Sequence, residues 1–442
     1  MRRRYRIKRF GLGVGLVFLA LLVVGWWWTS FTREGQATYN VVEHHVTEWA
    51  KRNLASAAAD PLATGSISGT VCDEQGTPLE GATVVVSTRQ GETVSTHSRA
   101  DGRYTLEGVQ VGWVVPAAIL HGYRPQVYRL APWQQTTPVR VRADTTTPGV
   151  DFGLEPTTLP ALLPQVERWE QVPVSNAFPE LTTALRTRVT FERQGYQVTS
   201  YIYEPLWASE TEDELPTVVA VFPSDPLNWE PASVAFVTQG YLVLGVGPVS
   251  MRDLDVTADT EDLRLAMVLL HEGKLDPRVD RDRIVALGGS FSSMALMRVM
   301  HDAPYVRGVV LMGGLTDAYL LRYDAYHSGY AGYSVSPTFE YAMWSLGRPD
   351  RRPRMYIENS GAFNVQGLPP VCIIHGTGDA IIPYNQSERL AEALRKAGQP
   401  YELHIYKDTD HYPGVQDPSP ATQAMYWEMV RFFAQQLDVA SP

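Results

Sequence analysis

A long uncharged run lies near the N-terminus of the chain. From Phe10 to Phe31 there is no acidic or basic residue, and most positions are apolar. A helix of this length rises about 33 Å, which is enough to cross roughly 30 Å of hydrocarbon. Bases precede the run and tryptophans end it, as is typical of a span whose N-terminus stays in the cytoplasm. We therefore expect residues 1–33 to form a single-pass anchor in the cell membrane, with everything after Arg33 outside the cytoplasm. A cleaved signal peptide is the alternative.

Residues 65–155 alternate between short apolar runs and turn formers. Ser66–Val71 and Ala82–Ser87 are two such runs, and Asp- and Gly-rich turns separate them from their neighbours. This pattern predicts a small all-β sandwich. Residues 34–64 before it are expected to be a juxtamembrane spacer. Residues 156–184 after it are expected to be a linker, because a Pro- and Thr-rich stretch leads into them.

From residue 185 onward the pattern changes. Short, nearly all-apolar runs alternate with helical patterns, which is typical of strands covered by helices on both faces. The alternation predicts an α/β domain with a doubly wound, mostly parallel sheet. Residues 315–367 leave this pattern and are rich in aromatic residues, so they are either a lid over a site or a helical pair packed on the sheet. The expected strands are 189–191, 197–203, 217–222, 241–246, 283–287, 308–312, 371–375 and 402–406, and the expected helices are 259–272, 291–301, 387–397 and 422–437.

Composition excludes several classes of protein. The chain is 44% hydrophobic and 19% charged, like an ordinary globular protein. Its two cysteines, Cys72 and Cys372, exclude a disulfide-dense scaffold and a four-thiolate zinc site, and we expect both to be buried thiols. The net charge is −10 although the first ten residues contain six basic residues and no acidic one. The rest of the chain is therefore even more acidic than the net charge suggests. Its overall negative charge repels the phosphates of a nucleic acid, which argues against nucleic-acid binding.

One turn suggests a nucleophile. The predicted strand 283–287 runs into Gly288-Gly289-Ser290-Phe291-Ser292, and a helical pattern follows at once. A strand, a tight turn and a helix, with small residues two before and two after a serine, are typical of a nucleophile elbow. The turn would lift the Ser290 hydroxyl above the sheet edge. The helix N-terminus would offer N–H groups, starting with that of Phe291, to a developing oxyanion.

An acid and a histidine follow this serine in the order found in α/β-hydrolases. Asp379 lies on a Gly-rich loop after one predicted strand, and His411 follows the last predicted strand. All three residues lie past the carboxyl ends of strands, where sites in α/β sheets are found. We expect His411 to take the proton of Ser290, and Asp379 to hold the tautomer of His411.

Other polar residues near these motifs have alternative roles. Asp408 and Asp410 lie on the loop of the histidine, and either could replace Asp379 as the acid. His375 ends a strand and is expected to be structural. Glu340 and Glu358 could hold a substrate amine, but solvated positions are expected for both.

The sandwich region resembles a known family. The string Gly69-x-Val71-x-Asp73, continued by Gly81-Ala82-x-Val84 and Asp101-Gly102-Arg103-Tyr104, resembles the carboxypeptidase regulatory-like domain. This resemblance implies a non-catalytic, prealbumin-like sandwich.

A second resemblance covers roughly residues 185–440. The string Asp280-x-x-Arg283-Ile284-x-x-x-Gly288-x-Ser290, the His375-Gly376-x-x-Asp379 loop and His411 resemble the prolyl oligopeptidase-type serine hydrolases. Dienelactone hydrolases and acetyl-xylan-type esterases are similar. The resemblance implies an α/β-hydrolase fold that cleaves a peptide or a small ester through an acyl-serine, with no metal or organic cofactor.

The sequence departs from this family pattern in two places. Where relatives usually have glycine after the nucleophile, this chain has Ser292 and Ser293. Where relatives often have His-Gly-Gly after the first core strand, it has Phe222-Pro223-Ser224-Asp225. Proline has no N–H, so the second oxyanion donor must come from Ser224 or Asp225, or be missing. A missing donor costs about 10²–10³ in rate.

Three functions remain open at this point. A serine-type peptidase is the first choice, on the prolyl oligopeptidase resemblance. A carboxylesterase is the second, because residues 65–155 are too short for a propeller whose blades need roughly 40–50 residues each. A catalytically weak hydrolase that serves as a binding module is the third, because of the altered oxyanion stretch.

Overall fold

The computed structural model describes residues 63–439 apart from 131–135, 159–161, 176–182, 211–212, 250–254, 328–346 and 412–418, together with Val24, Gly25, Trp27 and Trp28. The expected anchor and spacer therefore lie almost entirely outside the described residues. Within the described part of the chain, no helix is both long and apolar enough to span a bilayer.

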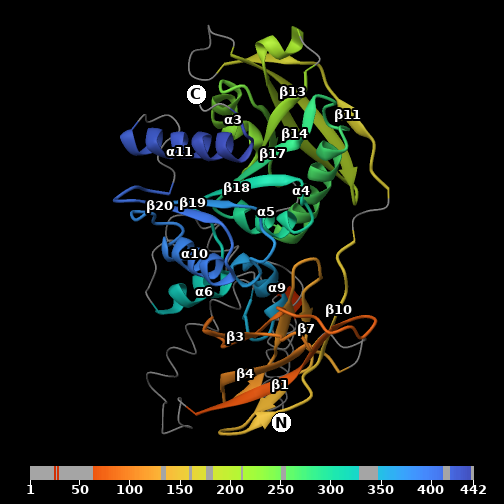
Figure 1. The fold of residues 1–442 in the computed structure, drawn as a ribbon, viewed down its shortest axis with the longest axis vertical. Coiled ribbons are helices and arrows are strands. Elements are labelled where there is room, and N and C mark those ends of the chain that lie inside the picture. The colour runs from red at the N-terminus through yellow and green to blue at the C-terminus, as the bar shows by residue number, and fades with distance from the viewer. Residues whose placement is uncertain are drawn as a thin grey trace, which may run out of the picture.

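The first domain, residues 64–154, is a β-sandwich (Figure 1). Its alternating apolar side chains meet in one core that includes Ile67, Val84 and Leu106. One sheet has the order β10 (Phe152–Leu154), β1 (Thr64–Asp73) and β4 (Arg103–Gln110), with β9 (Thr146–Thr147) also paired to β1. The other has the order β3 (Thr93–His97), β2 (Thr83–Ser87), β6 (Ala117–Ile119) and β7 (Gln126–Val127), and β5 (Gly112–Val114) pairs with β8 (Val139–Val141).

The second domain is a large sheet with helices on both faces, and it has an α/β-hydrolase-type fold (Figure 1). The strands from β16 to β20 pair in parallel, whereas β14 runs antiparallel to its neighbours β13 and β16. In the described residues the sheet has ten strands, in the order β11 (Val166–Arg168), β13 (Ala184–Arg193), β14 (Tyr196–Pro205), β16 (Leu242–Val246), β15 (Leu215–Val221), β17 (Val279–Gly289), β18 (Val306–Met312), β19 (Val371–Gly376) and β20 (Tyr401–Tyr406), with β12 (Val172–Val174) beside β13.

Helices bury the two faces of this sheet in separate cores. On one face lie α3 (Glu230–Val237) and α11 (Pro420–Gln436), and on the other lie α4 (Val256–His271), α5 (Ser292–Met300) and α10 (Asn385–Ala397). Local sequence sets their ends: the Ser419 hydroxyl accepts the N–H of Thr422 at the start of α11, and Gly398 ends α10 at φ +66°. Short helical turns lie at η1 (Leu206–Glu210), η2 (Pro226–Trp229) and η4 (Gly361–Phe363).

Two expectations for the connections and cysteines need correction. Residues 156–184 are not only a linker, because β11 and β12 within them pair with β13 at the sheet edge. These three-residue strands are partly exposed and lack a clear apolar alternation, so the sequence did not reveal them. Cys372 is buried, but Cys72 is only half-buried, and both are free thiols.

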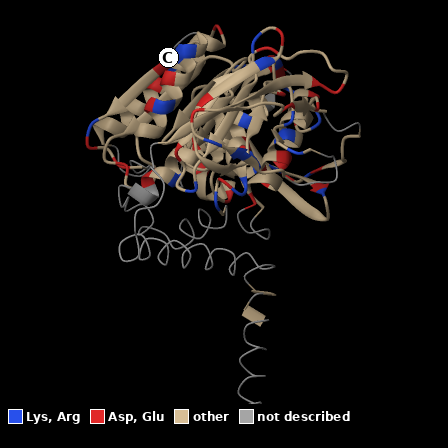
Figure 2. Ribbon diagram, turned by 90° about the horizontal axis from the view of Figure 1, so that it is seen from below, with Lys and Arg blue, Asp and Glu red and all other residues tan. Residues whose placement is uncertain are grey.

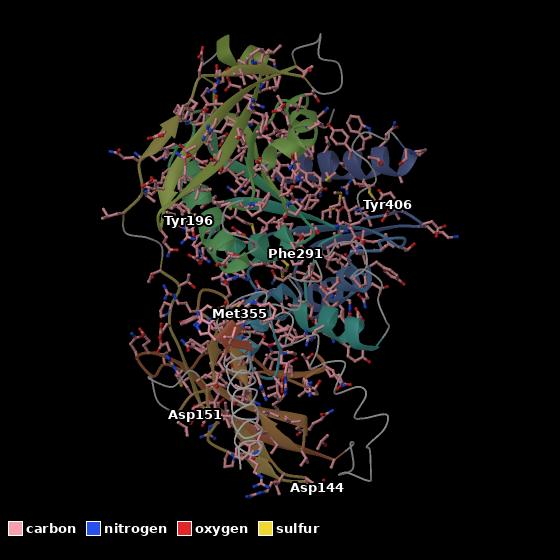
Figure 3. All side chains as sticks on the ribbon, turned by 180° about the vertical axis from the view of Figure 1, so that it is seen from behind. Asp144, Asp151, Tyr196, Phe291, Met355 and Tyr406 are labelled. Atoms are coloured by element: carbon pink, nitrogen blue, oxygen red, sulfur yellow. The ribbon has the colours of Figure 1, made fainter. Side chains whose placement is uncertain are left out.

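The aromatic insertion lies between the two domains. Its described part forms α6 (Ala318–His327) and α9 (Pro353–Glu358), which separate the sheet from the sandwich in Figure 1. Figure 3 shows the same order, with Met355 between Phe291 and the sandwich residue Asp151. Sandwich and insertion share one apolar core, to which Val85, Ile119, Met294, Tyr319 and Tyr356 belong. The Thr83 hydroxyl also donates to the Phe363 carbonyl at 2.8 Å.

Candidate active site

Ser290 occupies the turn between β17 and α5. Its φ is +54°, in the left-handed region that L-residues rarely adopt outside strained turns. The backbone N–H of Ser290 donates to the Met312 carbonyl at 3.2 Å, and its carbonyl accepts from the N–H of Leu315 at 3.1 Å. The end of β18 therefore holds the strained turn in place. The hydrogen bonds that the structure describes for Ser290 all involve its backbone.

Small residues around the serine allow this close packing. A Cβ on Gly288 would lie 2.9 Å from Leu296 Cδ2. The Ser292 hydroxyl contacts the carbonyls of Val221 at 2.6 Å and Gly289 at 2.7 Å, and it accepts the N–H of Gly289 at 3.1 Å. Ser292 therefore ties the turn to β15, which a glycine could not do. The hydroxyl of Ser293 is buried and has no hydrogen-bond partner among the described residues.

Asp379 and His411 form a direct buried pair. Nδ1 of His411 donates to Oδ2 of Asp379 at 2.5 Å. The other carboxylate oxygen, Oδ1, accepts the N–H groups of Ile381 and Ile382, each at 2.8 Å. The exposed fractions are 8% for Asp379, 4% for His411 and 5% for Ser290, so the three residues are shielded from water.

Hydrogen bonds keep the Asp379 carboxylate ionised. Burial raises the pKa of Asp379, but hydrogen bonds from His375 and His411 outweigh burial and lower this pKa to about 2. An ionised carboxylate only accepts hydrogen bonds, so it holds the proton of His411 on Nδ1. Nε2 of His411 then carries the lone pair that a general base needs.

His375 contacts Asp379 as well. Its Nε2 lies 3.1 Å from Asp379 Oδ2 and 3.0 Å from the Ile382 carbonyl, and its Nδ1 lies 2.7 Å from Ser387 Oγ. These partners assign the hydrogen to Nε2, because both groups facing Nε2 are acceptors. The sequence predicted a structural role for His375. The structure makes that role specific, because His375 positions Asp379.

Gly313 brings the serine turn and the Asp–His pair together. It follows Met312, the acceptor of Ser290, and its own N–H donates to the Ile374 carbonyl at 2.9 Å. A Cβ on Gly313 would lie 3.1 Å from His411 Nδ1 and 3.3 Å from Asp379 Oδ2. The structure therefore gathers Ser290, Asp379 and His411 at one edge of the sheet, around the carboxyl ends of β17, β18 and β19.

The structure gives the two alternative acids, Asp408 and Asp410, other surroundings than the ring of His411. Asp410 accepts the backbone N–H of His411 at 2.7 Å, and the Asp408 side chain is 83% exposed.

Glu358 is buried, not solvated as expected, because Arg354 donates to it at 2.6 Å and Arg298 lies 3.7 Å away. Glu340 lies outside the described residues.

The loop after β15 is shaped by side-chain hydrogen bonds. The Ser224 hydroxyl accepts from Nε1 of Trp229 at 2.9 Å, and Asp225 caps η2 by accepting the N–H of Leu227 at 3.0 Å. Within the described part of the chain, no acceptor takes the backbone N–H of Ser224 or Asp225. Phe222 and Pro223 share a cavity of about 40 Å³ with Phe291 and Ser292, so this loop faces the serine turn.

One group of side chains has the residue types of a metal site, but its thiol and its carboxylate are not in a state to bind a metal. Ligand atoms of Cys372, Glu402 and His404 lie within 4.8 Å of one another. Arg431 already pairs with Glu402, and burial raises the pKa of the Cys372 thiol to about 12. A metal needs a thiolate, so this group does not suit one.

Comparisons with known proteins match the two domains to two families. Residues 257–440 match the prolyl oligopeptidase family, and residues 66–155 match the carboxypeptidase regulatory-like domain. Two curated relatives, both named inactive dipeptidyl peptidase 10, come from Rattus norvegicus and Mus musculus. Each is 33% identical over 91 residues, which is 20% of this chain but 11% of the relative's length. The chain thus matches only a small part of these relatives.

Solved esterases resemble the second domain in fold. Esterase 2 of Thermogutta terrifontis is 20% identical, with a TM-score of 0.44 over 57% of this chain and 94% of the esterase. A mutant of esterase rPPE is 17% identical, with a TM-score of 0.49 over 61% of this chain and 86% of the esterase. Independently of these structures, the segment that holds Ser290, Asp379 and His411 matches the prolyl oligopeptidase family, and it follows a segment that matches the carboxypeptidase regulatory-like domain.

Proposed function

We propose that this protein is a serine hydrolase that cleaves peptide or ester bonds through an acyl-serine at Ser290. The observation that carries the proposal is the buried contact between Asp379 and His411, 2.5 Å long, beside a serine in a left-handed elbow. The family match over residues 257–440 supports the same reaction class.

The proposed reaction follows from the arrangement of these groups. Oγ of Ser290 attacks the acyl carbonyl while Nε2 of His411 takes its proton, and the ionised Asp379 stabilises the imidazolium that forms. His411 then gives the proton to the departing amine or alcohol. Water repeats both steps on the acyl-serine and releases the acid. The N–H of Phe291, with that of Ser224 or Asp225, would stabilise the oxyanion.

A peptidase is the first choice for the substrate class, on the family match. A carboxylesterase is the second, because the sandwich that stands before the catalytic domain is far smaller than a propeller. Ser290 as a whole is only 5% exposed, so access for a substrate depends on what lies over the elbow. A weak hydrolase is the third choice, because Pro223 removes one N–H from the oxyanion loop.

The full chain in detergent can distinguish these three functions. It should be labelled by a fluorophosphonate probe and then tested on p-nitrophenyl acetate and on a panel of peptide amides. Cleavage of peptide amides would support the peptidase, and cleavage of the acetate alone would support the esterase. Labelling without turnover would indicate a weak hydrolase. Labelling at a serine other than Ser290 would refute the assignment.

We also propose that the chain is anchored in the cell membrane by Phe10–Phe31, with the hydrolase domain outside the cytoplasm. The proposal rests on the uncharged run and on the bases before it. The protein should stay with membranes after carbonate extraction, and protease added to spheroplasts or intact cells should digest the hydrolase domain. Full protection of that domain after any outer membrane has been permeabilised would mean that the orientation is wrong.

A further inference from the structure

A second cavity lies in the seam between the sandwich and the α/β domain. Its volume is about 300 Å³. The sandwich contributes residues 119, 120 and 122–125 with the nearby Thr157 and Thr158, and the α/β domain contributes side chains from α4, α5 and α9. The nine residues of α5 begin just after Ser290 and span about 13 Å, so this cavity lies at the opposite end of the helix from the elbow.

Arginines dominate the charge of the cavity. Four of its described lining residues are arginines and three are carboxylates, so the lining is net positive. Guanidinium groups present a planar fork of N–H donors that matches the paired oxygens of a carboxylate or a phosphate. The arginines are Arg124, Arg264, Arg298 and Arg354, and the carboxylates are Glu261, Asp302 and Glu358.

The carboxylates present do not use the full donor capacity of these arginines. Arg264 pairs with Asp302 and lies 3.5 Å from Glu261. Burial lowers its pKa, the charge of Glu261 partly opposes this, and the nearby charges of Arg298 and Arg124 lower the pKa as well. Among the described residues, Arg298 has long contacts, 3.4 Å to Asn359 Oδ1 and 3.7 Å to Glu358 Oε2. An added anion would relieve the repulsion between these guanidinium groups.

Both domains supply the site. Arg124 comes from the sandwich, and the hydrogen bond that the described part of the chain gives its Nη2 is a long one, 3.4 Å to the Thr158 hydroxyl. Beside it, Nδ1 of His121 lies 2.6 Å from Nδ1 of His301, so one ring donates to the other across the seam. Burial lowers the pKa of both histidines, that of His301 to about 3. The two rings are therefore neutral near pH 7, and the arginines set the charge.

We propose that this cavity binds a small oxyanion, a phosphate group or a carboxylate, between Arg124 of the sandwich and Arg264 and Arg298 of the α/β domain. A volume of about 300 Å³ is at the lower end for ligand sites, which suits a small molecule. An anion that contacts both sides would favour the docked arrangement of the two domains. This site does not depend on the proposed hydrolase function, so Ser290→Ala should bind the anion equally well.

Calorimetry on the full chain in detergent tests the proposal. Inorganic phosphate and succinate are titrated separately at constant ionic strength set with chloride, and at least one should bind saturably. Arg298→Gln and Arg124→Gln should each weaken that binding about tenfold or more, because each removes a charged donor. Arg307→Gln is the matched control and should change nothing, because Arg307 is half-exposed and contacts Asp282 outside the cavity.

Hydrogen exchange gives a second measurement. Bound anion should slow exchange both in residues 119–125 of the sandwich and at the C-terminal end of α5. Phosphate binding alone would identify a phosphoryl ligand, and succinate binding alone a carboxylate ligand. The proposal is overturned if neither anion binds saturably, if Arg124→Gln binds as the wild type does, or if protection is confined to one domain. Arg124 is exposed, so its variant should fold even if Arg298→Gln does not.

Discussion

His375 donates a hydrogen bond to Asp379 Oδ2 at 3.1 Å, and His411 contacts the same oxygen at 2.5 Å. Two imidazole N–H groups therefore converge on one carboxylate oxygen, while two backbone N–H groups take the other oxygen. This arrangement explains how a buried carboxyl can have a pKa of about 2, and it fixes the plane of the carboxylate against His411.

The first prediction concerns pH and His375. The pKa of Asp379 is lowered in the folded chain, so its charge stabilises the fold above about pH 4, and this stabilisation is lost as the pH falls towards 2. His375→Gln removes part of this lowering. The variant should therefore lose more unfolding free energy at pH 6 than at pH 3, by up to about 1 kcal/mol, measured by urea unfolding. In an Asp379→Asn background this pH-dependent difference should disappear; if it persists, Asp379 is not its source.

The second prediction concerns the nucleophile. Ser290→Ala should abolish both hydrolysis and fluorophosphonate labelling and leave the fold intact, since the hydrogen bonds described for Ser290 are made by its backbone. Ser293→Ala is the control from the same turn. Its buried hydroxyl has no described partner, so this variant should keep its activity and unfold no more easily than the wild type. Activity that survives Ser290→Ala but not Ser293→Ala would reverse the assignment.

The third prediction separates the three candidate acids. Asp379→Asn should keep the fold but lower kcat by about 10⁴, the loss seen when the acid of a related triad is neutralised and the wrong tautomer is presented. Asp410→Asn and Asp408→Asn should retain most activity, because Asp410 accepts a backbone N–H and Asp408 is exposed. Steady-state kinetics on any substrate found in the screen would check this. A crippled Asp410→Asn beside an active Asp379→Asn would place the acid on the histidine loop.

The fourth prediction tests the space around the Asp–His pair. Gly313→Ala adds a Cβ 3.1 Å from His411 Nδ1 and should lower kcat strongly. Gly240→Ala is the matched control, because Gly240 also has a positive φ but nothing within 4 Å of the added Cβ. Both variants should lose about 1–2 kcal/mol of unfolding free energy from left-handed strain. Equal kcat values for the two would mean that Gly313 plays no part in positioning the pair.

Local patterns in the sequence predicted the core strands and helices of the second domain well. The apolar run expected at 371–375 is β19, and the helix expected at 387–397 is α10, because buried parallel strands and amphipathic helices leave strong periodic signals. The edge strands β11 and β12 were missed, because short exposed strands carry no such signal. For the insertion, residues 315–367, the sequence left two alternatives undecided, a lid over the site and a helical pair packed on the sheet.

The candidate site could be predicted only in part. Motif order and strand ends predicted that Ser290, Asp379 and His411 lie at one edge of the sheet, because the carboxyl ends of parallel strands share that edge. The contact of His375 with Asp379 depends on how the loop after β19 folds back, which no spacing rule supplies. The burial of Glu358 and the arginine cavity depend on contacts between α5, α9 and the sandwich, which lie far apart in the sequence. Figure 2 shows that acidic and basic residues are otherwise interspersed over the described ribbon.

The apolar core shared by the sandwich and the insertion limits how this protein can be cut for expression. A fragment that starts at residue 156 would leave Met294, Tyr319 and Tyr356 without their cover, and the isolated sandwich would expose Val85 and Ile119. Each square ångström of apolar surface uncovered costs about 25 cal/mol, and such surfaces promote aggregation. The two segments match different families, but they should be produced, purified and crystallised as one piece.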